Sequence, residues 1–589
     1  MKANSDSHAV MIGVDIGGTF TDFAVVTGSN LFFTKVPSTP ADPGQAVIDG
    51  LMRIRDTLGI DPGDITRLVQ GTTVSTNALL EAKGAPTGLI TNRGFEDILE
   101  IGRQNRSSLP GDFPIYNFNL QRPRPLVSRR HRLGVRGRIS YNGGEIEPLS
   151  VEDVAEACAI LRKEGIGSVA VCLLGSYLDP SHERRVKEVL QSHHPDAEIT
   201  LSSEVLPEFR EYERTSTTVI SAYLKPVMKR YLDRLERRLR EFGVRAPLEI
   251  MQSNGGITTA SDAGERAVYT LLSGPAGGVQ GARYLTGEEG GTGGNLLTLD
   301  IGGTSTDLSL VAGGSPAFTS EARVGGYPVR TPMIEINTVG RGGGSIVRLD
   351  PAGGLQIGPD SAGADPGPIA YGRGGTEPTL TDAHLILGHL DPAARLGDEI
   401  RLDRNRARAA FEERIAGPMG ITAEEAAQGA IDIAISEIRR AAGVISIEKG
   451  HDPRDFTLVA FGGAGPLYAL RLAQEMDIPR VVIPNGPGVL SALGLLTVDV
   501  RHDFVRSEIT PLEEADPSRL EQLLSEMTRQ GNGELERAGF SPDDITFEVN
   551  LDLRYLGQAY ELQISLGRFG PEDSEDAFSR MWPGIAALA

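Results

Sequence analysis

Runs of apolar residues separated by polar turns predict much of the secondary structure of this chain. Strand-like runs at Val10–Val14 and Phe23–Val26 flank a turn with two glycines, and the same arrangement recurs at Asn295–Leu299 and Leu308–Val311. Two short apolar runs joined by a glycine turn are typical of a β-hairpin. The pattern therefore predicts two similar hairpins, one near the N-terminus and one in the middle of the chain.

The rest of the chain alternates between strand and helix patterns up to about residue 190 and then becomes more helical. Thr87–Thr91 and Ser168–Leu174 are predicted strands, and Val151–Glu164 is a predicted helix. This alternation is typical of an α/β fold. In the helical part, residues 231–242 place three leucines on one helix face, which core packing explains: Leu232, Leu235 and Leu239.

The changes of pattern divide the chain into three predicted domains, at residues 1–195, 196–505 and 506–589. Each of the first two contains one hairpin. The third begins with a polar helix, Asp516–Ala538, and continues with strands at Ile545–Tyr555 and Tyr560–Ile564. We expect it to be a smaller α/β domain.

The two hairpin turns carry chemistry suited to phosphate groups. They read Gly13-Val-Asp-Ile-Gly-Gly-Thr-Phe-Thr-Asp22 and Thr298-Leu-Asp-Ile-Gly-Gly-Thr-Ser-Thr-Asp307. Paired glycines allow backbone amides to approach phosphate oxygens closely, and the threonines add hydroxyl donors. The carboxylates Asp15 and Asp300 would repel phosphate unless a hard cation such as Mg²⁺ lay between them. A nucleotide with its metal satisfies both features.

Other interpretations of the turns are weaker. A single Asp-x-Gly-Gly-Thr segment could be a tight hairpin whose Asp and Thr bond to their own backbone. Two matching copies favour a shared function. The dinucleotide-binding fingerprint and the Walker loop fit poorly, because neither hairpin leads directly into a helix and no Gly-Lys-Ser/Thr follows.

A third glycine turn completes the predicted nucleotide site. An apolar strand from Phe456 leads into Gly462, Gly463 and Ala464, and a helix is predicted to follow through Met476. A Gly-Gly turn lets a nucleoside lie against the backbone without meeting a side chain. Two phosphate hairpins followed by this turn resemble the actin-like ATPases. The resemblance predicts duplicated α/β halves, ribonuclease H-like, around a nucleotide cleft, with Gly488–Leu496 as a small-residue helix that crosses between them.

Composition and charge exclude several classes of protein. The 589 residues carry a net charge of −21, which favours a soluble protein and argues against general binding to nucleic acid or membrane surfaces. One basic stretch, Ser128–Arg138, is interpreted as a solvated face or a contact between subunits. Cys158 and Cys172 are predicted to be buried and unpaired. No signal peptide and no apolar run of roughly 20 residues is found, so a cytoplasmic location is expected.

Further segments resemble the hydantoinase A family, in the same order along the chain. They are Gly71-Thr-Thr-Val-Ser-Thr-Asn-Ala-Leu-Leu80, Gly94-Phe-Glu-Asp-Ile-Leu-Glu-Ile-Gly-Arg-Gln104, Ser361-Ala-Gly-Ala-Asp-Pro-Gly-Pro368, Thr376–Ala383, Gly450-His-Asp-Pro-Arg-Asp455 and Leu553-Arg-Tyr-Leu-Gly-Gln558. The family includes N-methylhydantoinase, 5-oxoprolinase, caprolactamase and components of acetone and acetophenone carboxylases. The resemblance implies an ATP- and Mg²⁺-dependent subunit that phosphorylates a carbonyl or enolate oxygen. It also implies a hetero-oligomer with a hydantoinase B-like partner subunit.

The resemblance assigns roles to the residues of the three turns. Asp15 and Asp300 are expected to hold the metal, directly or through water, and to act in catalysis, with one of them orienting the acceptor. The expected cofactor-binding residues are Gly17, Gly18, Thr19, Thr21, Gly302, Gly303, Thr304 and Thr306 at the phosphates and Gly462, Gly463 and Ala464 at the nucleoside. Gly274–Gly278 and Gly340–Ser345 are expected to line the same cleft.

Three departures from the family pattern limit this transfer. The family's Asp-Ile-His-Thr segment is Glu335-Ile-Asn-Thr338 here, so no role of that histidine is carried over. The usual cysteine is also missing from Pro368–Gly372. The chain stops at Ala589, about a hundred residues earlier than relatives, so we expect the C-terminal domain to be truncated.

The leading functional hypothesis is the ATP-dependent subunit of a cyclic amidase that acts on a hydantoin, 5-oxoproline or another lactam. The alternative is the ATP-hydrolysing subunit of an acetone- or acetophenone-type ketone carboxylase. An ATP-switched scaffold or chaperone would need a peptide-binding domain after the nucleotide core, and residues 505–589 resemble the hydantoinase C-terminal domain instead. A sugar kinase fits the family motifs poorly. The sequence leaves open which substrate is used and which aspartate orients it.

Overall fold

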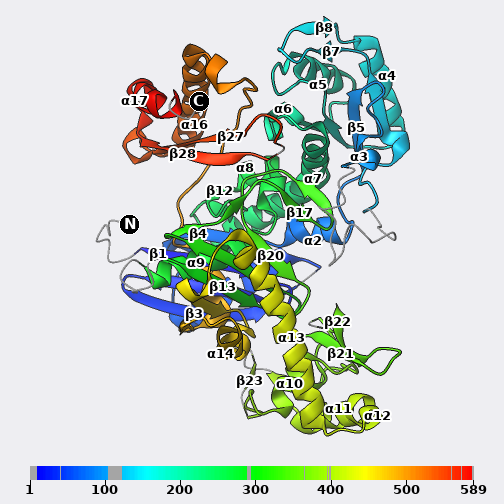
Figure 1. The fold of residues 1–589 in the computed structure, drawn as a ribbon, viewed down its shortest axis with the longest axis vertical. Helices are drawn as coiled ribbons and strands as arrows, with labels where there is room; N and C mark the ends of the chain where they lie inside the picture. The colour runs from blue at the N-terminus through cyan, green and yellow to red at the C-terminus, as the bar shows by residue number, and fades with distance from the viewer. Residues whose placement is uncertain are drawn as a thin grey trace.

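Two mixed six-stranded sheets form the centre of the computed structural model (Figure 1). The structure describes residues 9–39, 41–103, 123–287, 294–363, 365–393, 395–396, 400–558, 560–571 and 574–586. The polar start of the chain at residues 1–8, the last residue of the 94–104 motif and the final residues 587–589 therefore lie outside the described residues. Among the described residues, no helix is both long enough and apolar enough to cross a membrane.

The first sheet contains the first predicted hairpin. Its strand order is β12-β11-β4-β1-β2-β3, in which β1, β2 and β3 are antiparallel neighbours and β1, β4 and β11 run parallel. The strands are β1 Val10–Ile16, β2 Phe20–Thr27, β3 Asn30–Pro37, β4 Ile65–Gly71, β11 Leu248–Met251 and β12 Ile257–Thr259. One face is covered by α1 Pro43–Leu58 and the long α7 Glu211–Phe242, whose Leu232, Leu235 and Leu239 are buried as predicted.

The second sheet repeats this scheme around the second hairpin. Its order is β15-β14-β13-β25-β26, and β20 also pairs with β14. Again the hairpin strands are antiparallel and the two strands beyond β13 are parallel to it. The strands are β13 Leu296–Ile301, β14 Thr306–Ala312, β15 Ser315–Pro316, β20 Ile336–Val339, β25 Thr457–Phe461 and β26 Arg480–Val482. Both predicted hairpins and the duplicated α/β halves are thus confirmed.

The two sheets face each other across a pair of helices. α9 Ser273–Thr286 and α15 Leu490–Leu495 bury apolar side chains against both sheets at once. Their backbones touch: a Cβ on Gly494 would lie 1.9 Å from the carbonyl oxygen of Gly277. Only glycine allows the two helices to approach this closely. α15 lies within the segment 488–496, which was predicted to be a small-residue crossing helix.

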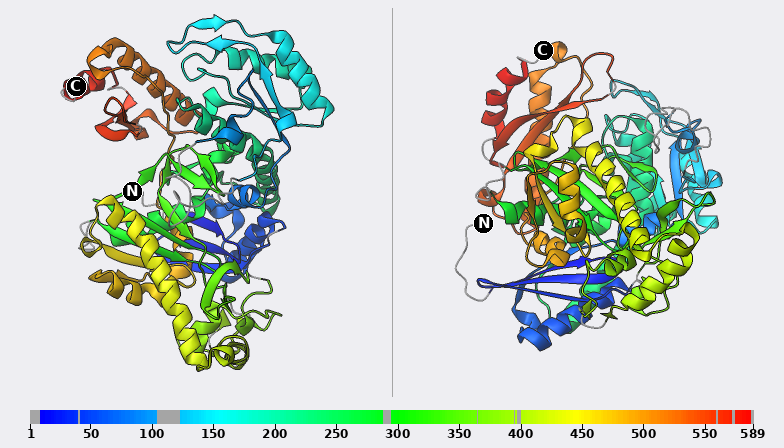
Figure 2. Two further views of the ribbon diagram at one scale, coloured as in Figure 1. Left: turned by 45° about the vertical axis from the view of Figure 1, so that its right-hand side comes forward. Right: turned by 60° about the horizontal axis from the view of Figure 1, so that its bottom comes forward.

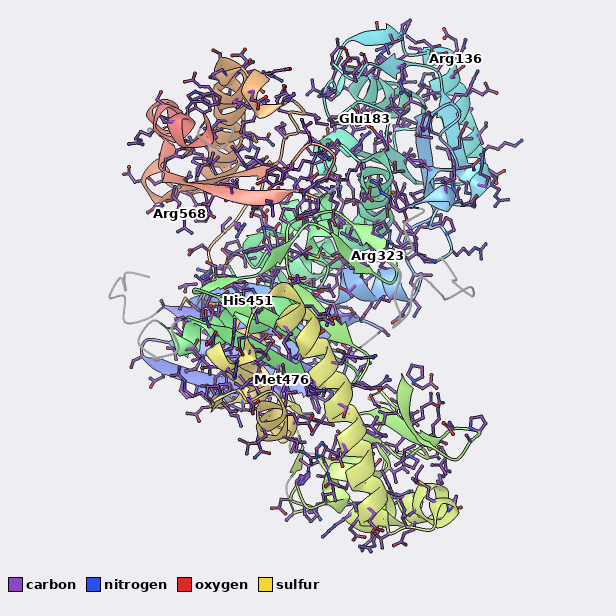
Figure 3. The ribbon with its side chains drawn as sticks, viewed as in Figure 1. Arg136, Glu183, Arg323, His451, Met476 and Arg568 are labelled. Atoms are coloured by element: carbon purple, nitrogen blue, oxygen red, sulfur yellow. The ribbon has the colours of Figure 1, made fainter. Side chains whose placement is uncertain are left out.

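Each half carries an insertion that extends away from the centre (Figures 1 and 2). In the first half this is a parallel sheet of order β10-β9-β5-β6, with α4 and α5 on one face and α7 on the other. Its elements are β5 Thr87–Asn92, β6 Arg132–Val135, β9 Ser168–Val171, β10 Glu198–Leu201, α4 Val151–Lys163 and α5 Ser181–His193. Figure 3 marks Arg136 and Glu183 in this unit. Cys158 and Cys172 are buried here with free thiols.

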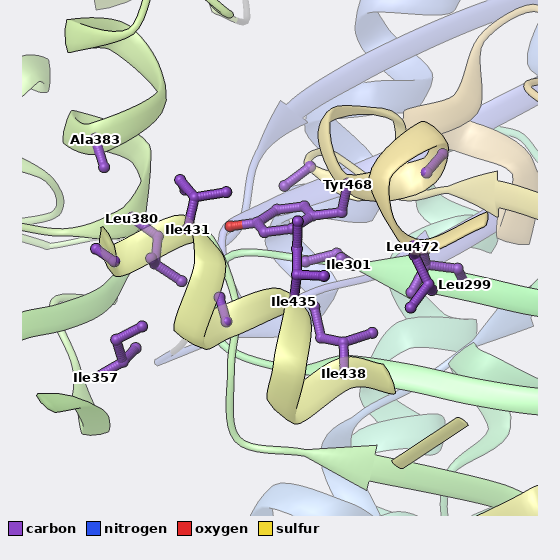
Figure 4. Close-up of a cluster of buried hydrophobic side chains, with 14 of the residues drawn as sticks. Leu299, Ile301, Ile357, Leu380, Ala383, Ile431, Ile435, Ile438, Tyr468 and Leu472 are labelled. Atoms are coloured by element: carbon purple, nitrogen blue, oxygen red, sulfur yellow. The ribbon is translucent and has the colours of Figure 1, made fainter. Parts of the chain in front are cut away.

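The insertion of the second half lies between β14 and β25. It contains the two-stranded sheet β21 Ser345–Leu349 and β22 Leu355–Ser361, with α10 Leu380–Ile386, α11 Arg404–Phe411 and α13 Ala423–Ile445. Its core is continuous with the outer face of the second sheet, where α13 and α14 Gly465–Glu475 pack (Figure 4). Ile431 and Ile435 of α13 meet Tyr468 of α14 and Ile301 of β13 in this cluster.

The C-terminal part combines α16 Pro517–Arg537 with the hairpin β27 Phe547–Leu553 and β28 Leu562–Phe569, and ends in α17 Ser574–Ala586. The polar helix and the two strands predicted there are present. Phe578 and Trp582 of α17 pack with Leu524 of α16. The domain boundaries at residues 195 and 505 remain predictions, and the first sheet takes β11 and β12 from beyond residue 195.

Candidate functional site

The first hairpin turn joins β1 to β2 through Gly17, Gly18 and Thr19. The Gly17 amide donates to the Phe20 carbonyl at 3.0 Å, and the Ser38 hydroxyl donates to the Gly17 carbonyl at 2.7 Å. Within the described residues, and apart from the two chain neighbours of Gly18, no heavy atom lies within 4 Å of the position that a Cβ on Gly18 would take. Ser38 therefore supports the turn on one side, and the space next to Gly18 is open to a ligand.

The second turn, Gly302 to Ser305, has the same internal bond, from the Gly302 amide to the Ser305 carbonyl at 3.0 Å. Its support comes from a different loop. The amides of Gly343 and Gly344 donate to the carbonyls of Gly302 and Gly303 at 3.0 and 2.7 Å. The loop expected to line the cleft, 340–345, thus packs directly on the second phosphate turn.

Thr21 and Thr306 hold corresponding places in the two hairpins. Both are fully buried. Thr21 shares a hydrogen bond of 3.0 Å with the Ser38 hydroxyl, and Thr306 donates to the Arg341 carbonyl at 2.5 Å. Their expected contact with phosphate stays a prediction. In this structure Thr21 connects its hairpin to the residue after β3, and Thr306 connects its hairpin to the 340–345 loop.

The two turns meet each other. A Cβ on Gly303 would lie 3.4 Å from the Thr19 hydroxyl oxygen, so the loops of the two halves are in contact range. The carboxylate of Asp300 also experiences the negative charges of Asp15 and Asp22 from the opposite half. Segments far apart in the sequence therefore form one site.

Strand register places a second carboxylate beside each predicted one. Asp15 is directly opposite Asp22, which is opposite Lys35 on β3. In the second half, Asp300 is opposite Asp307, which is opposite Thr338 on β20. Directly opposed residues point to the same face of a sheet. We call these sets the first row (Asp15, Asp22, Lys35) and the second row (Asp300, Asp307, Thr338).

The rows differ in the partners of their carboxylates. Lys35 Nζ lies 3.0 Å from Asp22 Oδ1, and the Thr338 hydroxyl donates to Asp307 Oδ1 at 2.6 Å. The side chains of Asp15 and Asp300 have no hydrogen-bond or ion-pair partner within the described part of the chain. These two carboxylates are the groups left available to a ligand.

Burial raises the pKa of all four carboxyl groups. The pKa of Asp15 rises to about 7, with a further contribution from Asp22, and that of Asp307 rises to about 6 although Thr338 and Ser305 lower it. The pKa of Asp300 is raised well above its usual value by burial and then by Asp307, Asp15 and Asp22. Burial also raises the pKa of Asp22, and Lys35 lowers it. A bound cation favours the ionised form of carboxyl groups whose pKa is raised in this way.

Glycines surround the two unpartnered carboxylates. A Cβ on Gly71 or on Gly274 would lie 3.1 Å from Asp15 Oδ1, and a Cβ on Gly462 would lie 2.2 Å from Asp300 Oδ1. The segment containing Gly274 was expected at the cleft. Gly71 was named only as part of a family motif, and its place as the last residue of the strand β4, next to the first hairpin strand, is the signal that marks it.

The third turn, between β25 and α14, joins the same site. Gly462 has a φ of +78°, and its amide donates to the Pro487 carbonyl at 2.9 Å. The Ala464 amide donates to the Ile301 carbonyl at 2.8 Å, beside the second hairpin. The Cβ position of Gly463 is open. The structure thus brings the residues of all three turns together.

Asp15 and Asp300 offer few protein ligands, so they suit a cation that keeps most of its water and phosphate ligands. Among the described residues, no group of three or more His, Cys, Asp or Glu side chains could hold a metal ion alone. Mg²⁺ usually binds through one or two carboxylates plus water and phosphate oxygens. Asp15 and Asp300 therefore fit a Mg²⁺–nucleotide complex and do not form a stand-alone metal site.

Asn337, which stands where the family has histidine, has a structural contact. Its side-chain amide donates to the Ala441 carbonyl of α13 at 2.9 Å. The side chain ties β20 to the helix that covers the second sheet.

Two family models match most of the chain. Residues 11–194 match the hydantoinase/oxoprolinase N-terminal region and residues 214–504 match hydantoinase/oxoprolinase. The chain belongs to the hydantoinase/oxoprolinase family. Both hairpins and the Gly462 turn fall inside the matched residues.

Known relatives include components of caprolactamase and of ketone carboxylases, and 5-oxoprolinase. The chain is 40% identical to the alpha subunit of caprolactamase from Pseudomonas jessenii over 94% of this chain and 80% of that protein. It is 33% identical to 5-oxoprolinase 1 of Arabidopsis thaliana over 92% of this chain and 46% of that protein. The solved structure of ATP-dependent caprolactamase from Pseudomonas jessenii superposes with a TM-score of 0.84 at 37% identity, covering 98% and 84% of the chains. Nucleotide-free acetone carboxylase gives 0.81 at 28% identity, covering 98% and 85%.

Proposed function

We propose that this chain is the ATP-dependent subunit of a cyclic amidase that phosphorylates the carbonyl oxygen of a lactam or hydantoin. The observation that carries the proposal is the meeting of two open glycine turns at two carboxylates that lack protein partners in the described part of the chain, Asp15 and Asp300. The third turn, at Gly462, lies against Asp300 on the nucleoside side of the same site. This arrangement suits a nucleotide triphosphate held between two halves.

The chemistry explains why ATP would be used. An unstrained cyclic amide resists hydrolysis because resonance leaves its carbonyl carbon weakly electrophilic. Transfer of the γ-phosphoryl group breaks its bond to the ADP oxygen and forms a bond to the amide oxygen. Water can then add to the activated carbon, and the C–N bond breaks as the ring nitrogen takes up a proton, which opens the ring and leaves an acyl phosphate. A second water hydrolyses the acyl phosphate to a carboxylate and inorganic phosphate.

The residues of this chain would position the reactants and balance charge, which is most of what phosphoryl transfer requires. The open turns at Gly18 and Gly303 offer backbone amides to phosphate oxygens. Mg²⁺, when bound, neutralises charge on the phosphates and on the transferring group. Asp15 and Asp300 would orient the metal's water ligands and the acceptor.

We further propose a hydantoinase B-like partner that completes hydrolysis, in a cytoplasmic hetero-oligomer. Relatives named as subunits support this part: the alpha subunit of caprolactamase and the beta subunit of acetone carboxylase from Xanthobacter autotrophicus. The second candidate function is the ATP-hydrolysing subunit of a ketone carboxylase, which the likeness to acetone carboxylase favours. Both use the same activation of a carbonyl or enolate oxygen.

The test is ATP turnover by the purified chain together with a hydantoinase B-like protein. One series contains lactams or hydantoins alone, and the other contains acetone or acetophenone with bicarbonate. We expect phosphate release coupled to ring opening in the first series. Turnover confined to the second series would replace the first proposal by the second, and turnover in neither, with ATP binding absent, would contradict both.

A further inference from the structure

The two carboxylate rows have the same first and second members and different third members. Lys35 completes the first row and Thr338 completes the second, at equivalent places in the strand register. The first row thus combines two carboxylates with an ammonium group. The second combines two carboxylates with a neutral hydroxyl. The duplicated site is therefore asymmetric in charge, although its backbone is duplicated.

Lys35 is held at this place by more than its ion pair. Its ammonium nitrogen lies 3.0 Å from Asp22 Oδ1 and 5.2 Å from the centre of the Phe20 ring. On its other side, a Cβ on Gly488 would lie 3.3 Å from the same nitrogen. Gly488 follows Pro487, whose carbonyl accepts the hydrogen bond from Gly462. The lysine thus stands between the first hairpin and the loop that supports the nucleoside turn.

We propose that Lys35 is a built-in counter-cation of the first row, and that it directs the divalent cation of the nucleotide to the second row, where Asp300 holds it. The assignment rests on the proposed ATP site and refines it. Asp15 is then the carboxylate left to orient the acceptor.

The reason is electrostatic. A fixed ammonium satisfies part of the negative charge of the first row and repels a second cation placed beside it. The second row has no such group, because Thr338 stabilises Asp307 only through a hydroxyl. Mg²⁺ needs few protein carboxylates when phosphates supply the remaining ligands, so one row is enough to select its position.

The first experiment measures Mn²⁺ binding in the presence of ADP, by the electron paramagnetic resonance signal of free Mn²⁺. Binding of a fluorescent ADP without metal is recorded in parallel. We expect Asp300→Asn to weaken Mn²⁺ binding about tenfold or more, and Asp15→Asn to weaken it several times less. Thr338→Lys, which gives the second row its own ammonium, should weaken Mn²⁺ binding about as much as Asp300→Asn.

The second experiment separates charge from shape. Lys35→Thr makes the first row resemble the second, and it should tighten Mn²⁺ binding or add a second Mn²⁺ per chain. The double variant Asp22→Asn/Lys35→Thr removes one negative and one positive charge together, and it should restore the behaviour of the unchanged protein. Lys187→Thr is the matched control, because Lys187 lies on α5 in the insertion of the first half and pairs with Glu204 there. It should leave Mn²⁺ binding unchanged.

Equal losses of Mn²⁺ affinity in Asp15→Asn and Asp300→Asn, with fluorescent ADP still bound, would overturn the assignment alone. An unchanged affinity in Thr338→Lys would also overturn it. If the unchanged protein bound neither fluorescent ADP nor Mn²⁺–ADP, the proposed ATP site itself would fail, and the assignment with it. These outcomes are distinguishable because the metal-free measurement reports the nucleotide site independently.

Discussion

The two halves of this protein share a sheet order and differ in what each adds to its hairpin. In both, an antiparallel hairpin is accompanied by strands parallel to its first strand, and two Asp residues lie directly opposite each other on the hairpin strands near the turn. In the first half Ser38 supports the turn, whereas in the second the 340–345 loop does. The duplicated backbone thus positions carboxylates, and the elements around it decide how each is used.

The halves also differ directly after the parallel strand that neighbours the hairpin. Asp15 is in register with Gly71 at the end of β4, and the next residue is Thr72. Asp300 is in register with Phe461 at the end of β25, and the next residue is Gly462 in the left-handed region. Only the second half therefore opens a glycine turn at this point. The difference favours placing the nucleoside in the second half.

The largest expected effect is on catalysis. Asp300→Asn and Asp15→Asn should each lower ATP turnover about 100-fold or more, because phosphoryl transfer depends on charges placed at the phosphates. Asp22→Asn should lower it much less, since Asp22 is already paired with Lys35. Steady-state turnover with the partner protein measures this. If Asp22→Asn lowered ATP turnover as much as Asp15→Asn and Asp300→Asn, the proposed difference in role between Asp15 and Asp22 would be wrong.

The next effect concerns the contact that holds the halves together. Gly494→Ala should destabilise the protein by about 1–3 kcal/mol, because its new Cβ would overlap the Gly277 carbonyl oxygen. Gly443→Ala, in α13 with open space around its Cβ position, is the control and should be neutral or stabilise by up to about 1 kcal/mol. Urea unfolding compares them. Equal stability in both variants would contradict the close helix crossing.

A smaller effect separates the phosphate side from the nucleoside side. Gly463→Ala should weaken binding of ATP and of adenosine about tenfold, or roughly 1.4 kcal/mol, by crowding the nucleoside. Gly18→Ala should weaken ATP binding similarly and leave adenosine binding unchanged. Both Cβ positions are open, so neither variant should unfold the protein. Calorimetric titration measures the affinity for both ligands. Equal changes in adenosine affinity in Gly463→Ala and Gly18→Ala would contradict the assignment of a phosphate side and a nucleoside side.

The smallest effect compares the acid sensitivity of the two halves. His384 of α10 is buried against Tyr468 in the second half, and burial together with His389 lowers its pKa to about 3 from 6.5. A histidine whose pKa is lowered on folding stabilises the protein above its unfolded pKa and loses this contribution as the pH falls through 6.5 towards 3. Stability should therefore fall by about 1 kcal/mol between about pH 6.5 and 5.5 from this group.

Hydrogen exchange measures that change. Protection factors of the amides in α13 and α14, which correct for the intrinsic pH dependence of exchange, should fall on acidification more than those of α1 and α7 in the first half. His384→Gln should reduce this difference. A difference that persists in His384→Gln would assign the acid sensitivity to other groups.

The local pattern of residues was sufficient to predict the hairpin strands and the three glycine turns. Alternating apolar residues and paired glycines act within a few positions of the chain, so β1, β2, β13, β14 and the turn at Gly462 followed from the sequence. The contacts of Gly71 and Gly274 with Asp15 did not follow, because each joins segments that meet only after folding. The burial of Thr21 was also missed, since strand alternation turns it to the face opposite Asp22.

Two Asp-Ile-Gly-Gly-Thr hairpins and one glycine turn can be predicted from the amino-acid pattern, since each depends on neighbouring residues alone. The pattern also identifies the family, through motifs that occur in the same order. The groups that accompany each carboxylate, in contrast, are known only from the folded structure. Lys35 and Thr338 reach equivalent places through the pairing of β3 with β2 and of β20 with β14, and this register depends on the packing of whole sheets. Cross-strand partners and the electrostatics they create are non-local, so they can be assigned only once the fold is known.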